Sequence, residues 1–61
     1  MAAPKFELYK DKSGDFRWRL LAANGETIAS GQGYTTKAKA QEGIDSVKEN
    51  ARKAIVEDKT A

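Results

Sequence analysis

The stretch DFRWRL, residues 15–20, alternates large apolar side chains with arginines. Phe16, Trp18 and Leu20 occupy every second position, and the two arginines lie between them. Because successive side chains of a β-strand point to opposite faces, this pattern predicts a strand with one apolar face and one charged face. The apolar face needs a covering layer, and the charged face is the first place to look for a binding surface.

Two further segments of the strand type flank this one. KFELYK, residues 5–10, places Phe6 and Leu8 on one face, and the turn-forming run DKSGD joins it to the central stretch. ETIAS, residues 26–30, follows the hairpin signal Asn24-Gly25. The three segments together predict an antiparallel meander.

Burial predicts the register of the first hairpin, because a slip of one residue would turn every side chain to the wrong face. If residues 12–14 form a three-residue loop with a left-handed glycine, Leu8 faces Trp18 and the apolar sets of both strands coincide. Glu7 then lies opposite Arg19 as a cross-strand pair of opposite charge. A loop one residue longer would place Leu8 opposite Arg17, so the apolar residues of the two strands would not face each other.

The second hairpin has two candidate registers. A two-residue turn at residues 24–25 places Ile28 opposite Leu21, on the arginine face. A three-residue loop at residues 23–25 places Ile28 opposite Leu20, on the apolar face. We favour the second register because it collects the apolar side chains on one side.

The segment TTKAKAQEGIDSVKENA has apolar residues at helical spacing. Thr35 or Thr36 is a suitable N-cap, and an amphipathic helix is predicted over about residues 37–50. Gly43 costs such a helix about 1 kcal/mol relative to alanine. We therefore expect Gly43 to make room for a bulky neighbour, with Trp18 as the best candidate.

These elements predict an α+β fold in which a three-stranded antiparallel meander packs against one C-terminal helix, in the order β-β-β-α. A chain of 61 residues is expected to be a single domain, residues 1–61, with an ordered core over about residues 5–50. The expected core comprises seven apolar side chains: Phe6, Leu8, Trp18, Leu20, Ile28, Ile44 and Val47.

The tail, residues 51–61, carries Ile55 and Val56 among charged residues. Two adjacent β-branched side chains are of little use to a free tail. One hypothesis is a short extended piece that packs on this sheet or on that of a partner. The alternative is a frayed terminus.

The chain resembles the YegP-like family of small bacterial and archaeal proteins. The resemblance rests on KFELYKDKSGDFRWRLLAANGETIA, on GYTTKAKAQEGIDSVKENA and on VED near the end, which cover nearly the whole chain. It implies single ββ-β-α units or tandem pairs of units that pack on each other. A single-unit chain is therefore expected to form a homodimer. The family has no known biochemical function, so the resemblance implies no catalytic residues.

Composition narrows the chemistry. The chain has no cysteine and no histidine, which excludes disulfides, thiolate ligands and imidazole ligands. Without histidine, the serines and threonines lack the usual activating base. We therefore expect no enzyme, no cofactor and no metal site. No apolar stretch is long enough for a signal peptide or a membrane span, so a cytoplasmic location is expected.

Two binding hypotheses remain. The leading one is a non-enzymatic homodimeric module, in which an open strand edge or the tail residues Ile55 and Val56 meet a second copy. The alternative is a nucleic-acid-binding protein, although a net charge of +2 is low for that role. A second copy of the chain or a nucleic acid could bind to a face that comprises five candidate residues: Tyr9, Arg17, Arg19, Leu21 and Tyr34. The simplest interpretation of that face is a solvated sheet surface with cross-strand pairs.

Overall fold

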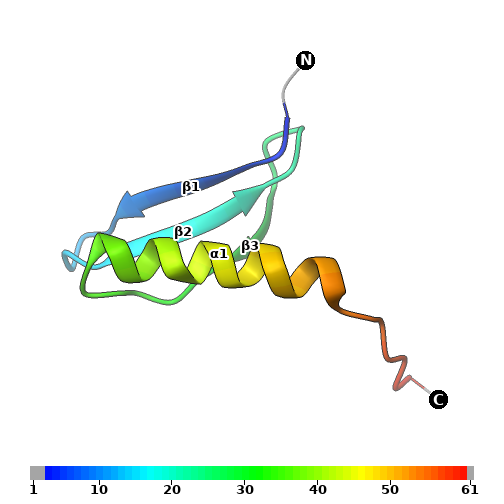
Figure 1. The fold of residues 1–61 in the computed structure, drawn as a ribbon. Coiled ribbons are helices and arrows are strands. Elements are labelled where there is room, and N and C mark those ends of the chain that lie inside the picture. The colour runs from blue at the N-terminus through cyan, green and yellow to red at the C-terminus, as the bar shows by residue number, and fades with distance from the viewer. Residues whose placement is uncertain (1–2, 61) are drawn as a thin grey trace.

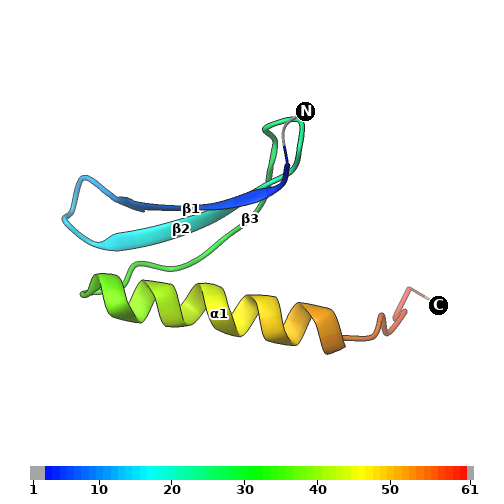
Figure 2. The ribbon, with the colours of Figure 1, turned by 45° about the horizontal axis from the view of Figure 1, so that its top comes forward.

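The computed structural model describes residues 3–60. Three strands, β1 (Lys5–Lys10), β2 (Phe16–Leu21) and β3 (Thr27–Ser30), precede the helix α1 (Lys37–Lys53). The strands form one antiparallel sheet in the order β1-β2-β3. The helix lies against one face of this sheet and leaves the other face open (Figure 2). The α+β class and the β-β-β-α order predicted from the sequence are confirmed.

The first hairpin has the predicted register. Leu8 pairs with Trp18, and Glu7 pairs with Arg19. Gly14 has a φ of 87°, a left-handed conformation that glycine adopts without a steric penalty. The backbone N–H of Gly14 donates to the carbonyl of Asp11 at 3.0 Å and closes the loop.

The second hairpin begins as predicted and then departs from the prediction. The loop at residues 23–25 has three residues, and Leu21 pairs with Thr27. The next pair joins Leu20 to Ala29, so a β-bulge leaves Ile28 as an extra residue without a partner across the sheet. Ile28 is 61% exposed, and its predicted place in the core opposite Leu20 is wrong.

The helix begins as predicted and ends later than predicted. Thr36 is the N-cap, and its Oγ1 accepts a hydrogen bond from the backbone N–H of Lys39 at 3.1 Å. The helix ends at Lys53, three residues beyond the predicted limit. Glu49 pairs with Arg52 at 2.7 Å and with Lys53 at 2.8 Å, and these cations also favour the negative end of the helix dipole.

The fully buried core is small. Trp18 is 5% exposed, Ile44 is 4% exposed and Ala40 is completely buried. The ring of Phe6 meets Trp18 edge to face, with centroids 5.6 Å apart. Four of the seven predicted core side chains are half-buried: Phe6, Leu8, Leu20 and Val47. Trp18 is therefore the only buried aromatic side chain of the described chain, and the layers pack around it.

Two glycines allow the layers to approach Trp18 closely. A Cβ atom on Gly31 would overlap the indole ring and would lie 2.8 Å from its Cζ2. A Cβ atom on Gly43 would lie 2.5 Å from Tyr34 Oη and 3.2 Å from Trp18 Nε1. Gly43 thus makes room for a bulky neighbour, as predicted, but Tyr34 occupies most of that room.

Candidate functional site

The face of the sheet opposite α1 brings four of the predicted site residues together. We call it the open face, and it comprises Glu7, Tyr9, Arg17, Arg19 and Leu21. Their side chains share this face because strands alternate their side chains and because Tyr9 pairs with Arg17 and Glu7 with Arg19. The face carries opposite charges side by side.

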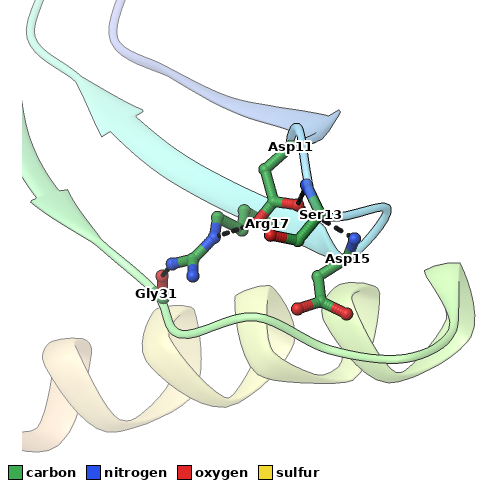
Figure 3. A network of polar contacts seen from close by, with 5 residues as sticks. All are labelled: Asp11, Ser13, Asp15, Arg17 and Gly31. Carbon is green, nitrogen blue, oxygen red and sulfur yellow. Dashed lines mark hydrogen bonds and ion pairs between the residues drawn. The ribbon is translucent and has the colours of Figure 1, made fainter.

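Arg17 is held by the first hairpin loop (Figure 3). Its Nε lies 2.5 Å from Asp11 Oδ2, and its Nη1 donates a long hydrogen bond of 3.4 Å to the carbonyl of Gly31. Asp11 Oδ1 accepts hydrogen bonds from the backbone N–H groups of Ser13, at 2.9 Å, and Asp15, at 3.0 Å. Arg17 therefore ties the β1–β2 loop to the segment that follows β3.

This network stabilises the charged form of both partners. The hydrogen bond from Arg17 lowers the pKa of Asp11 below its ordinary value of 3.8, and the N–H groups of Asp15 and Ser13 lower it further. The same hydrogen bond raises the pKa of Arg17 above its ordinary value. The site is thus a fixed ion pair and is not poised to exchange protons near neutral pH.

We expect the Asp11 pair to make stability depend on pH in the acid range. Because the pKa of Asp11 is lower in the folded state, its contribution is complete above its ordinary value of 3.8 and is lost as the pH falls through the lowered value. Urea titrations of the wild type between about pH 6 and pH 2 should therefore show falling stability. The Asp11→Asn variant should be less stable than the wild type at the upper end of this range. Its stability should also fall less than that of the wild type as the pH is lowered.

Glu26→Gln is the matched control, because Glu26 is an exposed carboxylate of the second loop. This variant should retain the wild-type dependence on pH. If the stability of the Asp11→Asn variant depends on pH in the same way as that of the wild type, the ion pair contributes nothing to folding.

Arg19 is also engaged within the sheet. Its Nε lies 3.0 Å from Glu7 Oε1, and its guanidinium carbon lies 4.2 Å from the centroid of the Tyr9 ring. Arg19 Nε is buried and has no aligned hydrogen bond within residues 3–60, so the contact with Glu7 is ionic and poorly directed. The stack on Tyr9 adds a cation–π contact.

Both arginines of the open face therefore have a carboxylate partner. Their side chains keep 39% and 41% of their surface exposed, for Arg17 and Arg19 respectively. A phosphate group would have to compete with Asp11 and Glu7 for the same guanidinium groups. This arrangement is the one expected of a solvated sheet face with cross-strand pairs.

Tyr34 lies apart from the open face. Its backbone pairs with Phe16 through two hydrogen bonds of 2.8 Å, and its hydroxyl reaches Gly43 on the helix. It therefore anchors the start of α1 to β2. Ile55 and Val56 follow the helix and are 86% and 94% exposed.

Two shallow hollows flank the beginning of β1. The first, which we call the helix-side groove, has a volume of about 450 Å³ and lies between β1 and α1. The second, the open-side hollow, has a volume of about 320 Å³ and lies beside the β2–β3 loop. The apolar part of the groove is lined by Phe6, Leu8, Leu20 and Ile44. The open-side hollow is lined by Ala3, Leu21, Ala22, Ala23 and Gly25, and Lys5 borders both hollows.

Lysine is the only titratable residue type in either lining, so neither hollow brings together a carboxylate, histidine or cysteine pair for acid–base chemistry or metal binding. Across residues 3–60, no group of three histidine, cysteine or carboxylate side chains could hold a metal ion. The helix within this range is not long and apolar enough to cross a membrane.

Comparison with known proteins gives the family. A family model described as a domain of unknown function, DUF1508, matches residues 11–58. The chain belongs to the DUF1508 family. A UPF0339 protein of Treponema denticola is 57% identical over 54 residues, which are 88% of this chain and 93% of that protein. The resemblance to the YegP-like family, which is the UPF0339 family, is confirmed.

Solved structures of similar proteins support the fold of this DUF1508 chain. A solution NMR structure of a protein from Haloferax volcanii is 44% identical, has a TM-score of 0.82 and aligns over 95% of this chain and 98% of that one. A protein from Agrobacterium tumefaciens is 47% identical, with a TM-score of 0.73 and coverage of 90% and 89%. The family is uncharacterised, so it assigns no role to the open face or to the hollows.

Two members of the Arg17 network, Asp11 and Gly31, were not predicted to contact it. A signal for Asp11 was present, because it lies two residues beyond Tyr9, the cross-strand partner of Arg17. Diagonal neighbours on one face of an antiparallel pair are within reach of long side chains. Gly31 had no such signal, because its position depends on the bulge at Ile28.

Proposed function

We propose that this chain is a non-enzymatic module that acts as a homodimer, in the cytoplasmic location predicted from the sequence. The observation that carries the proposal is an imbalance of apolar surface. Ile55 and Val56 are 86% and 94% exposed, whereas only three residues of the described chain are buried. Association with a second copy would remove such apolar side chains from water, at about 25 cal/mol per Å².

The size of the domain supports association. A chain of about 60 residues buries only about 60% of the surface that its unfolded form exposes. Small domains usually compensate with disulfides, a metal or oligomerisation. The sequence has no cysteine and no histidine, so a partner subunit is the compensation that fits this chain.

The chemistry of the described residues supports a role without catalysis. A general acid or base works best with a pKa near the working pH. The carboxylates with shifted values are Asp11 and Asp58, and both pKa values are lowered, by Arg17 and by the hydroxyl and N–H of Thr60. These shifts move the groups away from neutral pH, which is the wrong direction for catalysis.

Nucleic-acid binding, the alternative predicted from the sequence, gains no support from the open face. Asp11 and Glu7 already neutralise Arg17 and Arg19. The net charge of +2 would give only a weak attraction for phosphates. That function therefore stays a prediction, to be tested by titration with DNA and RNA at low salt.

We expect sedimentation equilibrium to give twice the chain mass of 6.7 kDa at micromolar concentration, with dissociation on dilution. The unfolding midpoint should rise with protein concentration, because dissociation and unfolding are then coupled. A mass of 6.7 kDa at every practical concentration, with a midpoint independent of concentration, would overturn the homodimer.

A further inference from the structure

We propose that residues 54–58 of each chain, the docking segment, add to the β1 edge of a second copy as an extra strand. The inference rests on the proposed homodimer and names its interface. The exchange is reciprocal, so that one two-fold axis relates two identical contacts. Each β1 then has a neighbour on both sides.

The docking segment is free to reach a second copy. It follows the last turn of α1 and leads away from the sheet of its own chain (Figures 1 and 2). Ala54 has φ −69° and ψ 138°, which is extended backbone. Five extended residues span about 17 Å, which is close to the span of about 20 Å for a six-residue strand such as β1.

The receiving edge is open in the described chain. The sheet order β1-β2-β3 places β1 at an edge, with β2 as its only neighbour within residues 3–60. Half of the backbone N–H and C=O groups of an edge strand point outward without a partner strand. Addition of an extended segment satisfies these groups, and pockets for alternate side chains give such additions their specificity.

The two hollows match the two apolar residues of the docking segment. Adjacent side chains on a strand point to opposite faces of the sheet, so Ile55 and Val56 would lie on different faces. The helix-side groove is on one face of the sheet and the open-side hollow is on the other, as the alternation of Leu20 and Leu21 shows. Both hollows border Lys5, so one strand beside the start of β1 would lie next to both.

Charge favours the same placement. Glu57 and Asp58 directly follow the apolar pair. The helix-side groove carries two exposed lysines, Lys5 and Lys48, and Lys48 Nζ lies 5.7 Å from the ring of Phe6. Because Glu57 and Asp58 point to opposite faces, one of them would face Lys48 in the helix-side groove and the other would lie near Lys5, which borders both hollows. These contacts would set the register of the added strand.

The first experiment compares variants of the full chain by sedimentation equilibrium. Ile55→Asp combined with Val56→Asp should raise the dimer dissociation constant by about a hundredfold or more, because the carboxylates would enter apolar hollows without partners. Both residues are exposed in the single chain, so the variant should keep its helix and sheet in circular dichroism. Ile28→Asp is the matched control and should leave the dimer intact.

The outcomes separate this inference from the proposed function. A monomeric wild type overturns the homodimer itself, and the docking inference with it. A dimeric wild type that is unaffected by the double substitution keeps the homodimer and overturns the docking segment. Dissociation by Ile28→Asp alone would place the interface at β3.

The second experiment needs no substitution. In a mixed sample of isotope-labelled and unlabelled chains, methyl groups of Ile55 or Val56 should show intermolecular nuclear Overhauser effects to the Phe6 ring. Contacts of the same methyl groups only within one chain would mean that the segment folds back on its own sheet, which would overturn the exchange.

A charge swap tests the register. Lys5→Glu with Lys48→Glu should raise the dissociation constant by about tenfold or more, and adding Glu57→Lys with Asp58→Lys should restore the wild-type value. Failure of the second pair to restore dimerisation would show that these charges do not meet.

Discussion

Replacing Trp18 with alanine should leave most of the chain unfolded at room temperature. Trp18 is 5% exposed and is the only aromatic side chain among the three buried residues of the described chain. Truncation of a buried tryptophan to alanine costs about 3–5 kcal/mol. The core of a domain this small rarely supplies more than about 3–5 kcal/mol of stability, so little or none would remain.

The measurement is far-ultraviolet circular dichroism across a urea titration, at the same protein concentration as the wild type. Trp18→Phe is the matched control because it keeps an aromatic ring against Phe6. It also sacrifices no hydrogen bond, since Trp18 Nε1 is buried without a partner among the described residues. A cooperative transition of Trp18→Ala at the wild-type midpoint would show that the core does not depend on this ring.

Replacing Gly31 with alanine should be the second most damaging single change. The new Cβ would overlap the indole of Trp18, approaching within 2.8 Å of Cζ2 and closer to Nε1 and Cε2. The ring cannot retreat easily, because Phe6 packs against it edge to face and it is buried to 5% exposure. Overpacking of this kind costs about 1–3 kcal/mol and occasionally more.

The same urea titration measures this loss, with Gln32→Ala as the neighbouring control. Gln32 is exposed, so its truncation should leave the midpoint nearly unchanged. Tryptophan fluorescence of Gly31→Ala should also report a displaced Trp18 in the fraction that stays folded. An unchanged midpoint and an unchanged emission spectrum would contradict the close approach.

Local pattern was sufficient for the first hairpin and for the start of the helix. The strict alternation of FRWRL and the apolar spacing of KFELYK left only one register that buries Leu8 against Trp18, and that register is present. Thr36 caps the helix because its side chain accepts a hydrogen bond from one of the first free backbone N–H groups. This effect is local. The alternation of apolar side chains in a strand and the cap of a helix can both be predicted from the sequence, because each depends only on residues a few positions apart.

The candidate surfaces could be predicted only in part. Alternation correctly placed Tyr9, Arg17, Arg19 and Leu21 on one face, and the pairing of Glu7 with Arg19 followed from the register. Tyr34 was added to this set as a stacking candidate near the helix start and not by alternation, and it packs towards the helix at Gly43. Its position depends on where the chain runs after β3, which no local pattern determines.

The sequence by itself determined the order of the elements, the inward face of the central strand and the first register, because hydrophobic alternation and turn chemistry act locally. Only the tertiary structure decided the bulge that exposes Ile28, the contact of Gly31 with the Trp18 ring and the extension of α1 to Lys53. These features depend on how three strands and a helix share the space around one indole ring. Their arrangement depends on packing between segments that are distant in the chain, so no short stretch of the sequence is enough to predict it.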